Sequence, residues 1–406
     1  MAYKPNPTIV TTQSGNYNVQ SAQRKYDVSK AIARYMPDAA PFTVLLKNLN
    51  SASVIDSTFK VLEEQPQPWA DAVNAGAGYT AAALTFVVDH STYFKAQDLI
   101  KNERTGEVMK VTTVTTATNT LTVIRSYGTT AAAIGLDNDP IRILGGAYED
   151  GSAMGAVRMV KVDSNTNYTQ RFKEPIQLPD TIMNTDLYGE PELQRLRKSK
   201  GIAHLIKIEN ALLFGEKAIY NPVSAGTFAT TAEECRATAG LLSWISSNVK
   251  TLGDGSLAGG GSLTEADFNT WLEDVMKFPG GQGSAKRTLF ASPRLCSVID
   301  GWGRDKLQTV PSDETYGIAV KEYKSSHGVI NIIKHPLLDG AYYGSYGIVA
   351  DMKNVGYRYL QGLDTKLYVD ISNRATTSGQ VDQYESECGL YLALEALHGV
   401  IKGVNS

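Results

Sequence analysis

The stretch EPELQRLRKSKGIAHLIKIENALLFG, residues 190–215, is the strongest helix signal in the chain. Pro191 stands near the first turn, where its missing N–H costs nothing, and Gly215 suits a C-terminal stop. Between them, apolar side chains recur at helical spacing, with Leu205 widening the stripe formed by Leu193, Leu196, His204, Ile208, Ala211 and Leu212. At a rise of about 1.5 Å per residue, the stretch predicts one helix about 37 Å long.

Upstream of this helix, residues 80–151 follow a β pattern. Residues 84–88 are a strand candidate, and residues 107–116 and 120–125 indicate a hairpin that turns at residues 117–119. Thr and Val dominate both arms, as β-branched residues suit a pleated surface, but the alternation is weak and one face is only partly apolar. Two interpretations remain open: a small β-domain with a solvated face, or a hairpin whose second surface lies on a neighbour.

The N-terminal part lacks the pattern of a folded core. Residues 1–20 are polar and without periodicity, and a short amphipathic helix is expected from Asp27 to just before Pro37. Residues 39–74 hold apolar runs that look extended, such as residues 44–46, and then a proline-rich stretch that favours extended backbone. We therefore expect an arm that lies across another surface.

Beyond the long helix, residues 231–370 alternate between strand and helix signals. Residues 262–265, with the sequence SLTE, fit a capping box, and Ser292 with Pro293 begins another helix directly after a strand. This alternation predicts an α/β or α+β domain. The apolar residues 385–401 fit a strand and a helix in part, so their pattern alone leaves both open.

Composition and motifs exclude several classes of function. The net charge is −3, from 39 Lys plus Arg against 42 Asp plus Glu, which lacks the basic excess of a dedicated nucleic-acid binder. The N-terminus has no apolar signal region and no run reaches about 18 apolar residues, so we expect no secretory signal and no membrane association. Cys235, Cys296 and Cys388 are widely spaced, so we expect neither a zinc site nor a disulfide framework.

The sequence also lacks a catalytic motif. It has no P-loop, no HExxH and no GxSxG, and none of its five histidines stand at the spacing of a helical metal pair. We therefore expect no catalytic, cofactor-binding or metal site, and no enzyme. The competing hypothesis is an uncharacterised α/β hydrolase, which would need a nucleophile beside His327 or His335.

Six short motifs, taken in order, carry a family resemblance. They are WADAVNAGAG at residues 69–78, TGEVMKVT at 105–112, VIRSYGT at 123–129, NYTQ at 167–170, IENALLFG at 208–215, and ESECGLYLALEALHGVI at 385–401. Each is weak alone, but their order resembles that of the tailed-bacteriophage major capsid protein family with the Hong Kong phage-type fold. The resemblance covers residues 27–404.

The resemblance implies an α+β architecture. Its parts would be an N-terminal arm (residues 1–78), a β-hairpin extended loop or E-loop (79–151), a peripheral domain (152–220 and 372–406) with its spine helix at 190–215, and an axial domain (221–371). It also implies that the ambiguous C-terminal segment is a strand of the peripheral domain.

The resemblance further implies a function. The chain would be a major capsid protein that self-assembles as pentamers and hexamers into the icosahedral head of a tailed bacteriophage around double-stranded DNA. It would reside in the virion, and in the host cytoplasm before assembly. Partners would be other copies, a separate scaffolding protein, a portal, a decoration protein and, non-specifically, the packaged DNA. Alternatives are an encapsulin-type shell protein or another phage structural protein.

Two sets of contact residues follow from this interpretation. Expected contacts between subunits come from the arm and the hairpin, and for each of them packing within the chain's own core is the alternative: Phe42, Leu45, Leu46, Trp69, Met109, Val111, Thr113, Leu121 and Val123. The basic face of the long helix is either solvated or faces DNA: Arg195, Arg197, Lys198, Lys200 and Lys207.

Overall fold

The computed structural model has the expected α+β class, with its elements in two compact units. It describes residues 40–151, 155, 157–185, 191–220, 234–256, 258–278, 286–302, 307–308, 321–371 and 379–405. Unit 1 comprises residues 1–61 and 166–406, and unit 2 comprises residues 62–165. The helix expected between Asp27 and Pro37 lies outside the described residues.

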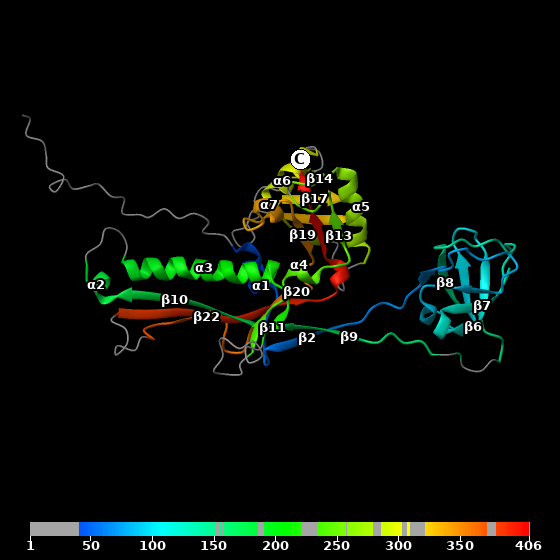
Figure 1. Ribbon diagram of the computed structural model, residues 1–406, viewed down its shortest axis with the longest axis horizontal. Helices are drawn as coiled ribbons and strands as arrows, with labels where there is room; N and C mark the ends of the chain where they lie inside the picture. Colours follow the sequence, from blue (N-terminus) through cyan, green and yellow to red (C-terminus); the bar gives the residue numbers. More distant parts are fainter. Residues whose placement is uncertain are drawn as a thin grey trace, which may run out of the picture. The chain divides into compact units, whose positions relative to one another are not determined.

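The long helix, α3 (Glu192–Phe214), forms where the sequence predicts it. It lies along two antiparallel strands of unit 1, β10 (Gln170–Pro179) and β22 (Gly379–Leu392), as Figure 1 shows. Its predicted stripe is buried at His204 and Ile208 and further at Leu212. The sheet below α3 has the order β1-β20-β22-β10, with β21 also paired to β22: β1 (Ser51–Val54), β20 (Val355–Leu360) and β21 (Lys366–Tyr368).

The expectation of an extended arm is wrong for residues 41–49, which form helix α1 (Pro41–Leu49). Pro41 starts the helix, where its fixed φ is favourable. Phe42, Leu45 and Leu46 are buried on one face of it and join the core below α3. An apolar run such as residues 44–46 suits a strand and a buried helix alike, and tertiary packing decided between them.

A second sheet in unit 1 holds seven strands in the order β13-β23-β19-β15-β18-β17-β16. Its central strands alternate between two apolar cores. On β15, Phe290 faces the core shared with α1 and α3, whereas Leu289 and Ala291 face a second core. The strands are β13 (Val249–Thr251), β15 (Lys286–Ala291), β16 (Leu307–Gln308), β17 (Lys321–Ser325), β18 (Gly328–Lys334), β19 (Gly347–Ala350) and β23 (Gly399–Lys402).

Two amphipathic helices supply the second core, α5 (Glu265–Met276) and α6 (Pro293–Gly301). The α6 cap is as predicted, because the Ser292 hydroxyl accepts a hydrogen bond from Leu295 N. The α5 cap lies two residues later than predicted. Thr264, and not Ser262, accepts from Asp267 N at 3.1 Å.

The C-terminal segment belongs to both sheets of unit 1. It is a strand up to Leu392, as the resemblance implies, and a short 3-10 turn then leads into β23. β23 pairs with β13 and β19 in the seven-stranded sheet, while β20, from the expected axial range, pairs with β22 in the other. Strands from the expected peripheral and axial ranges therefore occur together in both sheets.

Unit 2 is a small closed β-structure. Its sheet has the order β3-β8-β5-β6-β7-β4, and the two ends of that order meet at an antiparallel bridge between Val73 and Val88. The expected hairpin is present as β6 and β7, turning at Asn119 in the left-handed conformation. The strands are β3 (Ala70–Ala72), β4 (Thr85–Val87), β5 (Asp98–Asn102), β6 (Val108–Thr115), β7 (Thr120–Ile124) and β8 (Pro140–Gly146).

The chain passes between its two units along a pair of strands, β2 (Thr58–Glu63) and β9 (Asp163–Tyr168). The remaining elements are short: α2 (Asp180–Met183), α4 (Leu241–Trp244), α7 (Gly340–Tyr343), β11 (Ala218–Tyr220), β12 (Cys235–Ala237), β14 (Gly261–Ser262) and β24 (Val404–Asn405). No described helix is long and apolar enough to cross a membrane.

Candidate subunit-contact and nucleic-acid surfaces

The predicted arm contacts fall into two groups. Phe42, Leu45 and Leu46 pack inside unit 1, where the Phe42 ring meets Phe290 edge-on with 5.1 Å between centroids. Their apolar surface is therefore used within the chain. Trp69 remains accessible, with 47% of its surface exposed.

The predicted hairpin contacts divide in the same way. Met109, Val111, Leu121 and Val123 are buried in the core of unit 2. The closed sheet gives the apolar face of the hairpin a partner within its own unit, so the interpretation as a small β-domain accounts for these four. Thr113 is exposed. The accessible apolar side chains of unit 2 lie mainly elsewhere: Leu84, Ile124, Tyr127, Ile134, Leu136 and Leu144.

A buried ion pair orders the loops that carry several of these side chains. Arg125 donates from Nε and Nη2 to the two carboxylate oxygens of Glu107, each at 2.7 Å. Arg125 also donates to the carbonyl oxygens of Thr80, Ala83 and Ala133. Burial alone would raise the pKa of Glu107, but the hydrogen bonds from Arg125 and from backbone N–H groups hold that pKa below its ordinary value.

A second ion pair fixes the adjoining loop. Arg104 donates to both oxygens of Asp139 and to the carbonyl oxygen of Ile134. The Arg104 guanidinium, helped by Asn102, lowers the pKa of Asp139 to about 2. Leu136 N also donates to Asp139. Charge-assisted hydrogen bonds thus help to hold the loops that present Leu84, Ile134 and Leu136.

The basic face of α3 is largely matched by carboxylates of the same chain. Arg195 pairs with Glu192 one turn earlier, and Arg197 pairs with Asp382 on β22 at 2.7 Å. Lys200 and Lys207 both bind Glu174 on β10. Three of the five expected DNA-facing cations therefore help to hold α3 on its two strands, while the pair of Arg195 lies within the helix.

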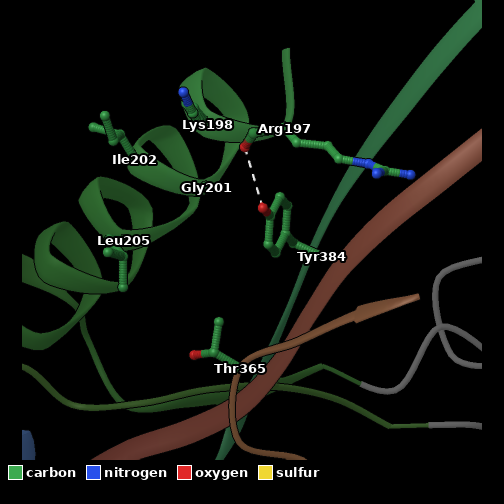
Figure 2. Close-up of a pocket in the computed structure, with 7 residues that line it drawn as sticks. All are labelled: Arg197, Lys198, Gly201, Ile202, Leu205, Thr365 and Tyr384. Atoms are coloured by element: carbon green, nitrogen blue, oxygen red, sulfur yellow. Dashed lines mark hydrogen bonds between the residues drawn. The ribbon is translucent and has the colours of Figure 1, made fainter. Parts of the chain in front are cut away.

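The fifth cation, Lys198, lies at a shallow hollow of about 430 Å³ beside α3. Figure 2 shows the Tyr384 hydroxyl in this hollow, where it donates to the carbonyl oxygen of Arg197 at 3.1 Å. Gly201 leaves room for the Tyr384 ring, because a Cβ there would stand 3.3 Å from the hydroxyl. The hollow is lined by Arg197, Lys198, Gly201, Ile202, Leu205, Thr365 and Tyr384.

The histidines invoked by the hydrolase hypothesis have structural or exposed positions. His335 is fully buried, and its Nε2 lies 2.7 Å from Glu209 Oε1 while its Nδ1 accepts from Leu337 N. Glu209 also accepts from Phe42 N at 2.9 Å and Thr43 N at 2.6 Å, so it caps the N-terminus of α1. Across the described residues, His, Cys, Asp and Glu side chains form no group of three suited to a metal ion.

Comparison with known proteins decides between the remaining classes. The model of the SU10 major capsid protein family matches residues 9–405, nearly the whole chain. The chain belongs to the SU10 major capsid protein family. It is therefore a tailed-phage major capsid protein, as the motif order indicated, and a structural component of the virion, not an enzyme. The family match favours this over the encapsulin-type and hydrolase alternatives.

Individual relatives of this SU10-type capsid protein are distant. A major capsid protein of Pseudomonas phage PaMx41 is 23% identical over 361 residues, covering 86% of this chain and 82% of that protein. Among solved structures, that of Mycobacterium phage Bobi has a TM-score of 0.47 at 10% identity and covers 95% of this chain and 97% of that one. The capsid of a native GTA particle has a TM-score of 0.47 at 9% identity, with 95% and 96% covered.

Proposed function

We propose that this SU10-type capsid protein assembles as pentamers and hexamers into an icosahedral head that encloses double-stranded DNA. Family membership carries the proposal. The exposed apolar side chains of unit 2 support it, because burial of such side chains against a neighbouring copy would favour association. Unit 2 corresponds best to the E-loop, although its ends, at residues 62 and 165, lie outside the expected 79–151.

We assign the contacts of unit 2 to its accessible side chains. Trp69 and Thr113 remain from the predicted set, and the loops held by Arg125 and Arg104 add Leu84 and Ile134. The buried members of the predicted set would act indirectly, by giving the unit the core that keeps these loops in place. Weak contacts of this kind sum over many subunits, and contacts between different faces of neighbouring copies can close into rings.

The remaining partners are part of the same proposal. A scaffolding protein, a portal and a decoration protein would bind copies of this chain, and assembly would take place in the host cytoplasm. Contact between α3 and packaged DNA would be weak, because Arg197, Lys200 and Lys207 are already paired with carboxylates. Lys198, which lines the hollow beside α3, belongs to the same basic face.

Electron microscopy of the expressed chain, with and without its genomic neighbours, tests the proposal. Uniform shells or capsomer rings are expected. A chain that stays monomeric at high concentration in both preparations would contradict it. The double variant Leu84→Ser/Ile134→Ser should remain folded and assemble less well, because both side chains are exposed in the subunit. The control Lys95→Ser lies on the same unit outside the proposed contacts and should assemble normally.

A further inference from the structure

A strand-like segment of unit 2 has no strand partner among the described residues. Residues 157–162, with the sequence VRMVKV, contain three valines, and β-branched residues of this kind suit a β-strand. They lead directly into β9 but form no backbone ladder themselves. Val157 and Met159 are 73% and 81% exposed. The segment thus exposes to solvent both its apolar side chains and the backbone groups that a neighbouring strand would pair.

The sequence explains why the segment is not paired within the chain. β9 pairs with β2, and the continuation of β2 would be the natural partner of residues 157–162. That continuation contains Pro66 and Pro68. Proline has no backbone N–H, so a ladder cannot extend along it. Since the described part of the chain offers these residues no partner strand, a second copy of the chain can supply one.

Among the described residues of unit 1, the outer edge of β1 has no partner strand. β1 pairs with β20 on one side, and its residues Ser51 to Ser53 are exposed. It carries neither proline nor charge, the usual means of blocking an edge. By contrast β10, at the other edge of the same sheet, carries Lys173, Pro175 and Pro179.

The residues that follow β1 strengthen its edge as a docking site. Ile55 is 92% exposed, the largest exposed fraction among the large apolar side chains described. Asp56 stands beside it and is exposed too. Asp56 and Lys161 carry opposite charges, so a pairing of the two segments that brings them together is favoured electrostatically.

We propose that residues 157–162 of one copy add as an extra strand to the free edge of β1 in a second copy. The proposal rests on the shell-forming function above and names one contact within it. The four residues of β1 offer an edge about 13 Å long, and the six residues of the segment are long enough to cover it. Backbone hydrogen bonds supply the affinity, and Lys161 facing Asp56 favours this edge over the basic edge of β10. The contact joins two different surfaces, as subunits arranged in rings or shells require.

Cysteine scanning tests the geometry in assembled particles. A chain with Ser53→Cys is mixed with a second chain in which one cysteine is introduced at each of residues 157 to 162 in turn. Both chains carry Cys235→Ser and Cys296→Ser, which leaves only the buried Cys388 of the native cysteines. Successive side chains of a strand point to opposite faces. Disulfide-linked dimers at twice the 44.0 kDa monomer mass should therefore form strongly at the one position opposite residue 53 and weakly at the positions next to it, whose side chains point to the other face. Equal crosslinking at all six positions, or none, would overturn strand addition.

Proline substitution tests the energetics. Val160→Pro/Lys161→Pro removes two adjacent N–H groups, one of which must face the partner strand, and should weaken subunit association at least about tenfold. Gln65→Pro/Gln67→Pro stiffens the other linker and should leave association unchanged. Neither pair should alter subunit unfolding. Normal association of Val160→Pro/Lys161→Pro would refute strand addition but leave the proposed function standing, because shells would still form. If the unmodified chain itself does not assemble, the proposed function is refuted instead.

Discussion

Glu209 is the side chain on which the position of α1 most depends. It stands on α3 and is fully buried, and it accepts hydrogen bonds from Phe42 N, Thr43 N, the Thr43 hydroxyl and His335 Nε2. Glu209→Ala leaves these four donors without their acceptor in a site that excludes water. At about 1 kcal/mol for each stranded donor, the low end of the usual range, unfolding should become easier by about 4 kcal/mol.

The substitution Glu209→Gln separates the hydrogen bonds from the volume of the side chain. Glutamine keeps one carbonyl oxygen but turns an NH₂ group toward donors, so about two of the four bonds are lost and the expected destabilisation is about 2 kcal/mol. Glu216→Ala is the matched control, because Glu216 is exposed just beyond the end of α3. It should change stability by less than about 0.5 kcal/mol.

Urea unfolding of the unassembled subunit measures these differences. Of the four tryptophans only Trp69 lies in unit 2, so a Trp69→Phe background makes tryptophan fluorescence report on unit 1 alone. The expected order of stability is Glu216→Ala, then Glu209→Gln, then Glu209→Ala. If Glu209→Ala unfolds within about 1 kcal/mol of the control, the idea that this carboxylate holds α1 in place is refuted.

Three further predictions concern unit 2. Glu107→Gln should destabilise it by about 3 kcal/mol, because Arg125 is left as a buried charge without its carboxylate. An unchanged denaturation midpoint, followed by the fluorescence of Trp69, would contradict this. The folded pKa values of Glu107 and Asp139 are depressed, so their contribution to the stability of unit 2 is present above the unfolded pKa values near 4. It is lost as the pH falls, for Asp139 through about 2. An increase in stability as the pH is lowered from 5 to 2 would contradict this. Deletion of residues 70–146 should leave unit 1 folded, by circular dichroism, but unable to assemble; loss of folding would mean that unit 1 needs this part.

The sequence predicts best what local pattern determines. The helix expected at residues 190–215 is α3, and the hairpin expected around residues 117–119 is β6 and β7, because caps, turns and periodicity act within a few residues. The cap of α5 was misplaced by two residues, since Ser262 and Thr264 both precede a carboxylate at suitable spacing.

What the sequence could not show depends on remote partners. α1 is a helix because Glu209, 167 residues from Phe42, caps it and because its apolar face fits the core. The sequence alone leaves Lys200, Lys207 and Arg197 without predicted partners, because Glu174 and Asp382 come from strands far away in the chain. The hairpin face seemed unfinished because the bridge that closes the sheet around it, Val73 to Val88, has no local signal.

The C-terminal segment passes from one sheet of unit 1, through β22, to the other, through β23, and this has a consequence for synthesis. Both strands emerge from the ribosome after every strand with which they pair, yet β22 lies between β20 and β10, and β23 lies between β13 and β19. Neither sheet can close until these last strands arrive, and such non-local pairing is slow. A nascent or truncated chain would then lack a finished surface to offer its neighbours, so that only full-length products would enter the growing particle.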